Sequence, residues 1–241
     1  IIAPTGMAKT LAAVLPIFDR FLKLRGEQEV RGISVLYITP LRALNRDIYR
    51  RVVELGAALD IDVRVRHGDT PSRARELQAR FPPDMLITTP ETLQAILPGK
   101  RMKEHLRSVR WVIVDEIHEL ATDKRGTQLS IGLERLRNLA GRDFQRIGLS
   151  ATVGEAEKAS AFLGGVNREV EVVRSPEIKR LDVTVDFPVP SQGDVKDAER
   201  FGIPASYVSR VREIIELIRG HRSTLVFTNT REHAEALGAL V

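Results

Sequence analysis

Residues 3–10 read A-P-T-G-M-A-K-T, and the segment that follows, Leu11–Leu24, has the apolar spacing of a helix. A glycine-containing turn that ends in Lys-Thr at the start of a helix is typical of a phosphate-binding loop. Ala3 and Ala8 stand where this motif has glycine. Ala8 adds a methyl group where backbone must approach phosphate, which weakens nucleotide binding about tenfold if its φ is positive. The stretch therefore predicts a nucleotide site at the end of a strand.

The rest of the chain alternates short apolar runs with amphipathic stretches, as parallel α/β proteins do. The apolar runs are Val35–Ile38, Val63–Val65, Met85–Ile87, Val112–Val114, Ile147–Leu149 and Val170–Val173. The amphipathic stretches are Leu11–Leu24, Leu41–Leu59, Ser72–Arg80, Glu91–Leu97, Thr127–Leu139 and Glu155–Leu163. This alternation predicts an α/β fold in which helices flank a parallel sheet on both faces.

The pattern changes after residue 178. Leu181–Phe187 alternates like an exposed strand, Pro188–Asp197 reads as a polar linker, and a helix over Tyr207–Arg219 leads to a buried strand, Thr224–Phe227. We expect one α/β domain over residues 1–178, a connector over 179–206 and the first βα unit of a second domain over 207–241. The chain starts at a strand end and stops within a helical pattern, so we expect an excised piece.

Two adjacent carboxylates directly follow an apolar run in the segment Trp111-Val-Ile-Val-Asp115-Glu116. At a strand end, one carboxylate can serve Mg²⁺ while its neighbour orients or deprotonates an attacking water. Alternatively, Glu116 only begins the next helix. The Lys9-Thr10 pair of the loop favours the catalytic interpretation, because Lys9 would reach phosphates and the Thr10 hydroxyl would bind Mg²⁺.

Several predicted strands end in turns rich in Ser and Thr. These turns are Ile38-Thr39-Pro40, Asp69-Thr70-Pro71, Thr88-Thr89-Pro90 and Ser150-Ala151-Thr152. Each could simply cap a helix. In a parallel sheet, however, such helix starts lie along one edge and present N–H groups to anions. Because arginines lie just beyond the turns, at Arg42, Arg46, Arg66 and Arg73, a nucleic-acid backbone is the favoured ligand.

Composition agrees with a globular protein that binds a polyanion. Of the 241 residues, 43% are hydrophobic and 29% charged, and 29 of the 37 basic residues are arginine, which binds phosphate bidentately. The lack of cysteine excludes disulfides and thiolate metal sites. No apolar run approaches the roughly 18 residues of a membrane span, and no signal peptide is visible. We expect a monomeric protein of the cytoplasm, associated with the nucleoid in a prokaryote, and no membrane partner.

Six segments in order resemble motifs I, Ia, Ib, II, III and IV of superfamily 2 helicases: A-P-T-G-M-A-K-T, T-P-L-R-A-L, T-T-P-E-T-L, D-E-I-H, S-A-T and L-V-F-T-N-T-R. The phrases R-H-G-D-T, D-E-I-H-E-L and G-L-S-A-T-V-G further resemble the Lhr, or large helicase-related, branch near the Ski2-like enzymes. The resemblance covers nearly the whole chain. It implies a RecA-like P-loop domain and the start of a second one, with ATP between the lobes and single-stranded DNA or RNA across their top.

The resemblance also implies a role for each residue that matches a motif. The residues implied to bind the nucleotide are Thr5, Gly6, Met7, Ala8, Lys9 and Thr10. Thr10 and Asp115 would hold Mg²⁺, and Glu116 would activate water, with Asp115 and Lys9 as the other catalytic groups. The residues implied to couple ATP state to lobe movement are His118, Ser150 and Thr152. Those implied to lie on nucleic acid are Pro40, Arg42, Thr89, Pro90, Thr228, Asn229 and Arg231.

The favoured function is thus a lobe of an ATP-dependent nucleic-acid helicase or translocase that couples hydrolysis to strand movement. One alternative is a nucleic-acid-binding scaffold with a weakened ATPase, for which Ala8 is the hint. Another is an unrelated P-loop phosphotransferase or GTPase, which would not bind nucleic acid. Motifs V and VI are missing from the chain. Because motif VI supplies arginine fingers that contribute about 10³-fold or more, we expect the chain alone to hydrolyse ATP poorly or not at all.

Overall fold

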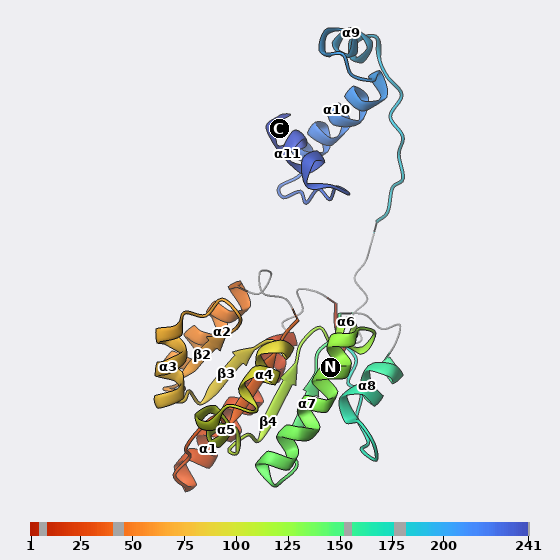
Figure 1. The fold of residues 1–241 in the computed structure, drawn as a ribbon. Coiled ribbons are helices and arrows are strands. Elements are labelled where there is room, and N and C mark those ends of the chain that lie inside the picture. The colour runs from red at the N-terminus through yellow and green to blue at the C-terminus, as the bar shows by residue number, and fades with distance from the viewer. Residues whose placement is uncertain (5–8, 41–45, 152–155, 176–181, 241) are drawn as a thin grey trace. The chain divides into compact units, whose positions relative to one another are not determined.

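The structure is a computed structural model that describes residues 1–4, 9–40, 46–151, 156–175 and 182–240 (Figure 1). The chain divides into two compact units, Ile1–Lys179 and Arg180–Val241. Within the described ranges, no helix has the length and apolar character that a membrane span requires.

The first unit is built on a five-stranded sheet with the order β2-β3-β1-β4-β5. The strands are β1 (Val35–Ile38), β2 (Val63–Arg66), β3 (Met85–Thr88), β4 (Trp111–Val114) and β5 (Gln145–Gly148). All neighbours pair in parallel. Every residue of β1, β3 and β4 is buried, as expected for central strands that are covered on both faces. The predicted α/β fold class is confirmed.

Helices cover both faces of this sheet (Figure 1). They are α1 (Lys9–Glu27), α2 (Arg46–Ala58), α3 (Ser72–Arg80), α4 (Pro90–Ile96), α5 (Lys100–Leu106), α6 (Ile117–Ala121), α7 (Lys124–Ala140) and α8 (Ala156–Gly164). On β1, Leu36 and Ile38 join the core cluster formed with α4 to α8, whereas Val35 and Tyr37 join the cluster formed with α1 and α2. This division follows from the alternation of side chains along a strand.

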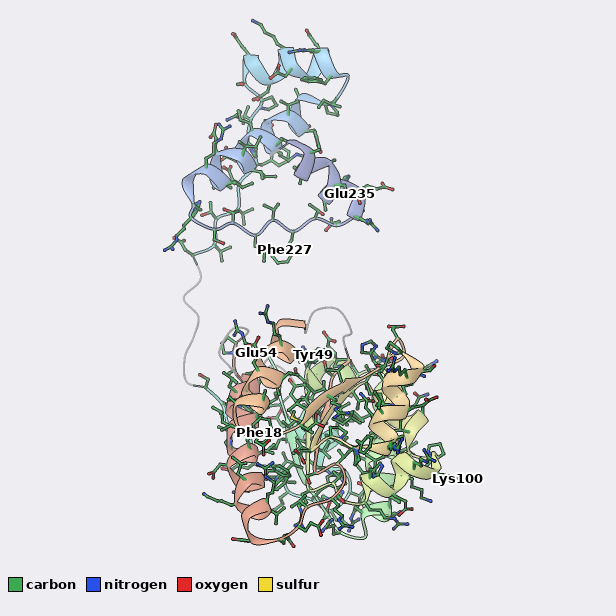
Figure 2. All side chains as sticks on the ribbon, turned by 90° about the vertical axis from the view of Figure 1, so that its left-hand side faces the viewer. Phe18, Tyr49, Glu54, Lys100, Phe227 and Glu235 are labelled. Carbon is green, nitrogen blue, oxygen red and sulfur yellow. The ribbon has the colours of Figure 1, made fainter. Side chains whose placement is uncertain are left out.

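The α1 side of the core depends on large apolar side chains. Phe18, labelled on α1 in Figure 2, is 1% exposed and Phe21 is 0% exposed. Burying such a side chain fully contributes about 1.5–3 kcal/mol to folding. This packing holds the first turn of α1, and therefore Lys9 and Thr10, against the carboxyl ends of the strands.

The chain start lies beside β5. Ile2 forms single parallel bridges to Ser150 and Arg174, and the Ala3 N–H donates to the carbonyl of Ser150 at 3.1 Å. The prediction of a strand over Val170–Val173 is wrong, because none of these residues is assigned to a strand. Within this run, the backbone hydrogen bond to the chain start is the one in which the carbonyl of Val173 accepts from the Ile2 N–H at 2.8 Å. A strand needs a partner along its length, and Val172 and Val173 are instead 39% and 54% exposed.

The second unit contains α9 (Gln192–Phe201), α10 (Ala205–Gly220) and α11 (Arg231–Leu240). The helix predicted over Tyr207–Arg219 is confirmed by α10. The polar linker predicted over Pro188–Asp197 is wrong, because α9 begins there with a capping box. In this box Ser191 Oγ accepts from the Asp194 N–H at 3.2 Å, and the Asp194 carboxylate accepts from the Ser191 N–H at 2.7 Å.

Two predicted strands of the second unit do not form in the part of the chain that the structure describes. Residues 182–187 and 224–227 have no strand assignment. Leu225 and Phe227 are 78% and 85% exposed, so the apolar run Thr224–Phe227 is not buried as predicted. The described residues offer this run no partner strand to pair its backbone groups.

Candidate nucleotide and nucleic-acid site

The lysine of the predicted phosphate loop contacts the segment that precedes the loop. Lys9 is the first residue of α1, and its Nζ donates to the carbonyl of Ala3 at 2.8 Å and that of Pro4 at 3.5 Å. The segment before the loop is in turn bonded to the end of β5 through Ala3. The two ends of the loop are therefore tied together. Thr5, Gly6, Met7 and Ala8 lie outside the described residues.

A tyrosine hydroxyl connects the two predicted magnesium ligands. Asp115 follows β4 and is 4% exposed; its Oδ1 accepts from the Glu116 N–H at 2.9 Å, and its Oδ2 accepts from the Tyr37 hydroxyl at 2.5 Å. The same Tyr37 hydroxyl lies 3.4 Å from Oγ1 of Thr10. Both oxygens of Asp115 are thus held, and the first turn of α1, the strand β1 and the end of β4 meet at one point.

Sequence reasoning missed Tyr37, although a single phenol in the strand V-L-Y-I was a visible signal. Burial, followed by the adjacent Asp115 carboxylate, raises the pKa of Tyr37 far above its usual range. The phenol therefore stays protonated, and its hydroxyl acts as a hydrogen-bond donor to the carboxylate.

Glu116 turns the chain away from the strand. Its backbone is left-handed, with φ 46° and ψ 45°, a conformation that costs a residue with a side chain roughly 1–2 kcal/mol. The following N–H, of Ile117, donates to the carbonyl of Leu149 at 3.0 Å and fixes α6 to the end of β5. The site thus contains a strained residue between two well-bonded neighbours, as active sites often do.

His118 lies between Glu116 and Ser150. Its Nδ1 is 3.5 Å from Oε2 of Glu116 and 3.2 Å from Oγ of Ser150. The imidazole therefore joins motif II to motif III, two of the segments predicted to couple ATP state to movement. Thr152, the third predicted coupling residue, lies outside the described residues.

The charges around Glu116 have opposing effects on its carboxyl group. Burial and then the Asp115 carboxylate raise the pKa of Glu116, while His118 and Lys9 lower it by smaller amounts. The net pKa is raised. A carboxylate with a raised pKa accepts a proton more readily near neutral pH, which is the property required of a general base.

The donor set suits magnesium. A carboxylate at Asp115 and a hydroxyl at Thr10 are hard oxygen donors, both in contact with Tyr37. Among the described residues no group of three or more His, Cys, Asp or Glu side chains could enclose a metal. Mg²⁺ is usually held by one or two carboxylates together with substrate phosphates and water, so the residues present fit it.

The predicted nucleic-acid turns follow β1 and β3. The Thr39 N–H donates to the carbonyl of Thr88 at 3.0 Å, which links these turns. Thr89 caps α4 by accepting from the Thr92 N–H at 3.3 Å, and Pro90 is the first helical residue. Pro40, Thr89 and Pro90 are all buried. Arg42 lies outside the described residues.

Sequence reasoning also missed Arg125, which connects the same two turns. Its guanidinium donates to the carbonyl of Pro40 at 2.9 Å and to Oε1 of Glu91 at 2.5 Å. No sequence signal pointed to it, because the contact depends on how α7 packs.

The second-unit residues that are predicted to contact nucleic acid lie at the start of α11: Thr228 and Asn229 precede the helix, and Arg231 is its first residue. Thr228 donates to the carbonyl of Thr230 at 2.9 Å, and Arg231 forms a 2.8 Å ion pair with Glu235. Asn229 is exposed. Arg231 is exposed as well.

Comparison with known proteins supplies the family. Residues 1–159 match the model of the DEAD/DEAH box helicase family. The chain is 41% identical over 252 residues to the ATP-dependent helicase Lhr-Core of Methanothermobacter thermautotrophicus, covering 98% of the chain and 28% of that relative. It is 39% identical over 264 residues to the Lhr helicase/uracil glycosylase of Escherichia coli, covering 99% of the chain and 17% of that protein.

A solved structure agrees with these relatives. Mycobacterium smegmatis helicase Lhr bound to ssDNA and AMP-PNP matches with a TM-score of 0.78 and 39% identity, covering 100% of this chain and 31% of that one. The chain thus spans less than a third of the length of these relatives. With the loop lysine, the paired carboxylates and the parallel sheet in place, the chain belongs to the DEAD/DEAH box helicase family, with Lhr helicases among its relatives.

Proposed function

We propose that this chain binds ATP with Mg²⁺ and single-stranded nucleic acid, and that in the complete protein it couples ATP hydrolysis to strand movement or unwinding. The observation that carries the proposal is the contact of one buried hydroxyl, that of Tyr37, with both Thr10 and Asp115. It brings the end of the phosphate loop and the first carboxylate to the same point of the sheet edge.

Each group at this edge has a distinct task in the proposal. Lys9 binds the outer phosphates of ATP, while Thr10 and Asp115 hold Mg²⁺, which neutralises phosphate charge when it is bound. Glu116 orients the attacking water and accepts its proton, because its raised pKa suits a base near neutral pH. His118, in contact with both Glu116 and Ser150, transmits changes at the carboxylate to motif III.

Single-stranded nucleic acid binds, in this proposal, along the turns after β1 and β3. Pro40, Thr89 and Pro90 lie in these turns, and contacts to the phosphate and sugar backbone are common in nucleic-acid recognition. Thr228, Asn229 and Arg231 contribute from the second unit. The ssDNA and AMP-PNP bound in the similar Lhr structure support the choice of single-stranded nucleic acid and ATP as the ligands.

We also propose a division of the chain into a first RecA-like lobe over residues 1–178, a connector over 179–206 and the start of a second lobe over 207–241. The connector is not a plain linker, since it carries α9, which packs against α10. The boundary agrees with the break between the two compact units at residues 179 and 180.

The test is ATP hydrolysis by the complete protein, measured with and without single-stranded DNA or RNA, beside a Glu116→Gln variant. Stimulation by a strand that is lost in the variant supports the motor function. Tight binding of ATP and strands without hydrolysis would instead favour the scaffold, for which Ala8 in the loop is the specific observation. Failure to bind any strand would contradict both.

A further inference from the structure

Arg125 spans the ends of two neighbouring strands. It is the second residue of α7, and its guanidinium donates at 2.9 Å to the carbonyl of Pro40, directly after β1. The same group donates at 2.5 Å to Oε1 of Glu91, the second residue of α4, which follows β3. β1 and β3 pair side by side. One planar side chain therefore links both turns that we assign to nucleic acid.

The Glu91 side chain is held in its charged form beside this arginine. Although burial alone raises it, the pKa of Glu91 is lowered, because Arg125, the Glu91 N–H and the Thr89 hydroxyl hydrogen-bond to the carboxylate. Thr89 is itself the cap of α4. The contact from Arg125 thus reaches the backbone of the second turn through a charged, hydrogen-bonded side chain.

Arg125 is also firmly connected to α6, the helix that directly follows Glu116. Between α6 and α7, the Asp123 N–H donates to the carbonyl of Leu120 at 3.2 Å, and the Gly126 N–H donates to the carbonyl of Asp123 at 3.0 Å. A Cβ at Gly126 would lie 1.8 Å from the carbonyl oxygen of Leu120. The turn is so close that a displacement of α6 must carry the start of α7 with it.

The contact is poorly placed to stabilise the fold. The side chains of Arg125 and Glu91 are 38% and 43% exposed, and ion pairs that are open to water contribute little to stability. Lysine could not replace the arginine here, because a single ammonium lacks the planar fork that reaches a carbonyl and a carboxylate at once.

We propose that Arg125 is a positioning residue. It transmits a displacement of α6, the helix that follows Glu116, to the two turns that we assign to nucleic acid. The inference rests on the proposed function, since it assigns to α7 the link between the ATP site and the nucleic-acid site. Its contacts couple Glu116, through Leu120 and Gly126, to Pro40 and Thr89.

The experiment compares Arg125→Ala with Arg107→Ala in the complete protein. Arg107 is a matched control: it pairs with Glu104 at 2.9 Å and donates to the carbonyl of Leu139 at 3.3 Å, but it lies before β4, at the opposite end of the strand from Asp115. We expect Arg125→Ala to keep the basal ATPase and the melting temperature. In Arg125→Ala we expect the concentration of single-stranded nucleic acid that gives half-maximal stimulation to rise by about 3- to 30-fold. We expect Arg125→Lys to recover only part of this loss.

The outcomes separate this inference from the proposed function. If the wild type shows no strand-stimulated hydrolysis, the proposed function fails and the inference fails with it. If the wild type is stimulated and Arg125→Ala behaves like Arg107→Ala, only the inference is overturned. A double-mutant cycle with Glu91→Gln adds a further check: we expect the double variant to be no worse than Arg125→Ala, and fully additive effects would contradict the bridge.

Discussion

The hydroxyl of Tyr37 donates a 2.5 Å hydrogen bond to Oδ2 of Asp115 from the neighbouring strand. Tyr37 pairs with Ile113 in the register of β1 and β4, and Asp115 follows two residues later on the same face. With Oδ1 held by the Glu116 N–H, the carboxylate is fixed at both oxygens. The carboxylate that we propose as a magnesium ligand is thus oriented by the protein's own hydrogen bonds.

Removing this hydroxyl should weaken the magnesium site. In Tyr37→Phe we expect the Mg²⁺ concentration for half-maximal ATP hydrolysis to rise about tenfold, because a hydrogen bond to a charged group contributes about 1.5–3 kcal/mol. Calorimetric titration with ATP in the presence and absence of Mg²⁺ checks this without turnover. Tyr207→Phe, in the second unit, is the control. Equal Mg²⁺ dependence in both variants would show that Tyr37 has no part in the metal site.

Replacement of Glu116 by glutamine should separate binding from hydrolysis. Because a positioned general base contributes typically about 10²–10⁴-fold, we expect hydrolysis in Glu116→Gln to fall by at least about 10²-fold. ATP affinity should stay within about threefold, since Lys9 and the loop are unchanged. Hydrolysis at saturating ATP and strand is the measurement. A variant that retained more than a tenth of the wild-type rate would remove Glu116 from the base role.

The same substitution should stabilise the fold at neutral pH. The pKa of Glu116 is raised above its ordinary value of 4.5, chiefly by burial and then by Asp115. The carboxyl therefore holds its proton more tightly in the folded state, so stability is lost as pH rises from the ordinary pKa through the raised one. Glu116→Gln lacks this loss, and we expect its Tm to exceed that of the wild type by about 1–3 °C at pH 7–8.

Thermal unfolding at several pH values checks that expectation. The difference in Tm between variant and wild type should shrink as the pH falls and should vanish below the ordinary pKa, where both side chains are neutral. A difference that is constant with pH would mean that the stabilisation comes from something other than the charge.

The turn between α6 and α7 should tolerate no side chain at Gly126. An added Cβ would lie 1.8 Å from the Leu120 carbonyl oxygen, so we expect Gly126→Ala to destabilise the chain by about 1–3 kcal/mol. Gly26 in α1 has no atom within 4 Å of such a Cβ, and Gly26→Ala should be neutral or stabilise by up to about 1 kcal/mol. Urea unfolding measures both. Two shifts of the same sign would contradict the close approach at Gly126.

The central strands were predictable because each is apolar and buried on both faces, so composition alone marks β1, β3 and β4. The runs at Val170–Val173 and Thr224–Phe227 carry the same composition but no strand forms there. A strand depends on a partner as well as on its residues, and the partner is not readable from the run itself. The α9 helix was readable in principle, since Ser191 and Asp194 have capping spacing.

Of the candidate site, Lys9, Thr10, Asp115 and Glu116 follow from short motifs whose chemistry requires them. Tyr37 and Arg125 belong to no such motif. The contact of Tyr37 with Asp115 depends on the register between β1 and β4, and that of Arg125 with Pro40 on how α7 packs. Both are tertiary relationships, which local patterns do not encode.

The left-handed backbone at Glu116 also limits how this position can evolve. At φ 46° and ψ 45°, asparagine, aspartate and glycine fit with the least strain, and β-branched residues fit worst. In a descendant that no longer hydrolysed ATP, the carboxylate at this position would not be needed, but the left-handed backbone would still be required by the fold. Its replacements should therefore drift towards asparagine, aspartate or glycine and away from valine and isoleucine, so that the lost activity would leave a recognisable trace in the sequence.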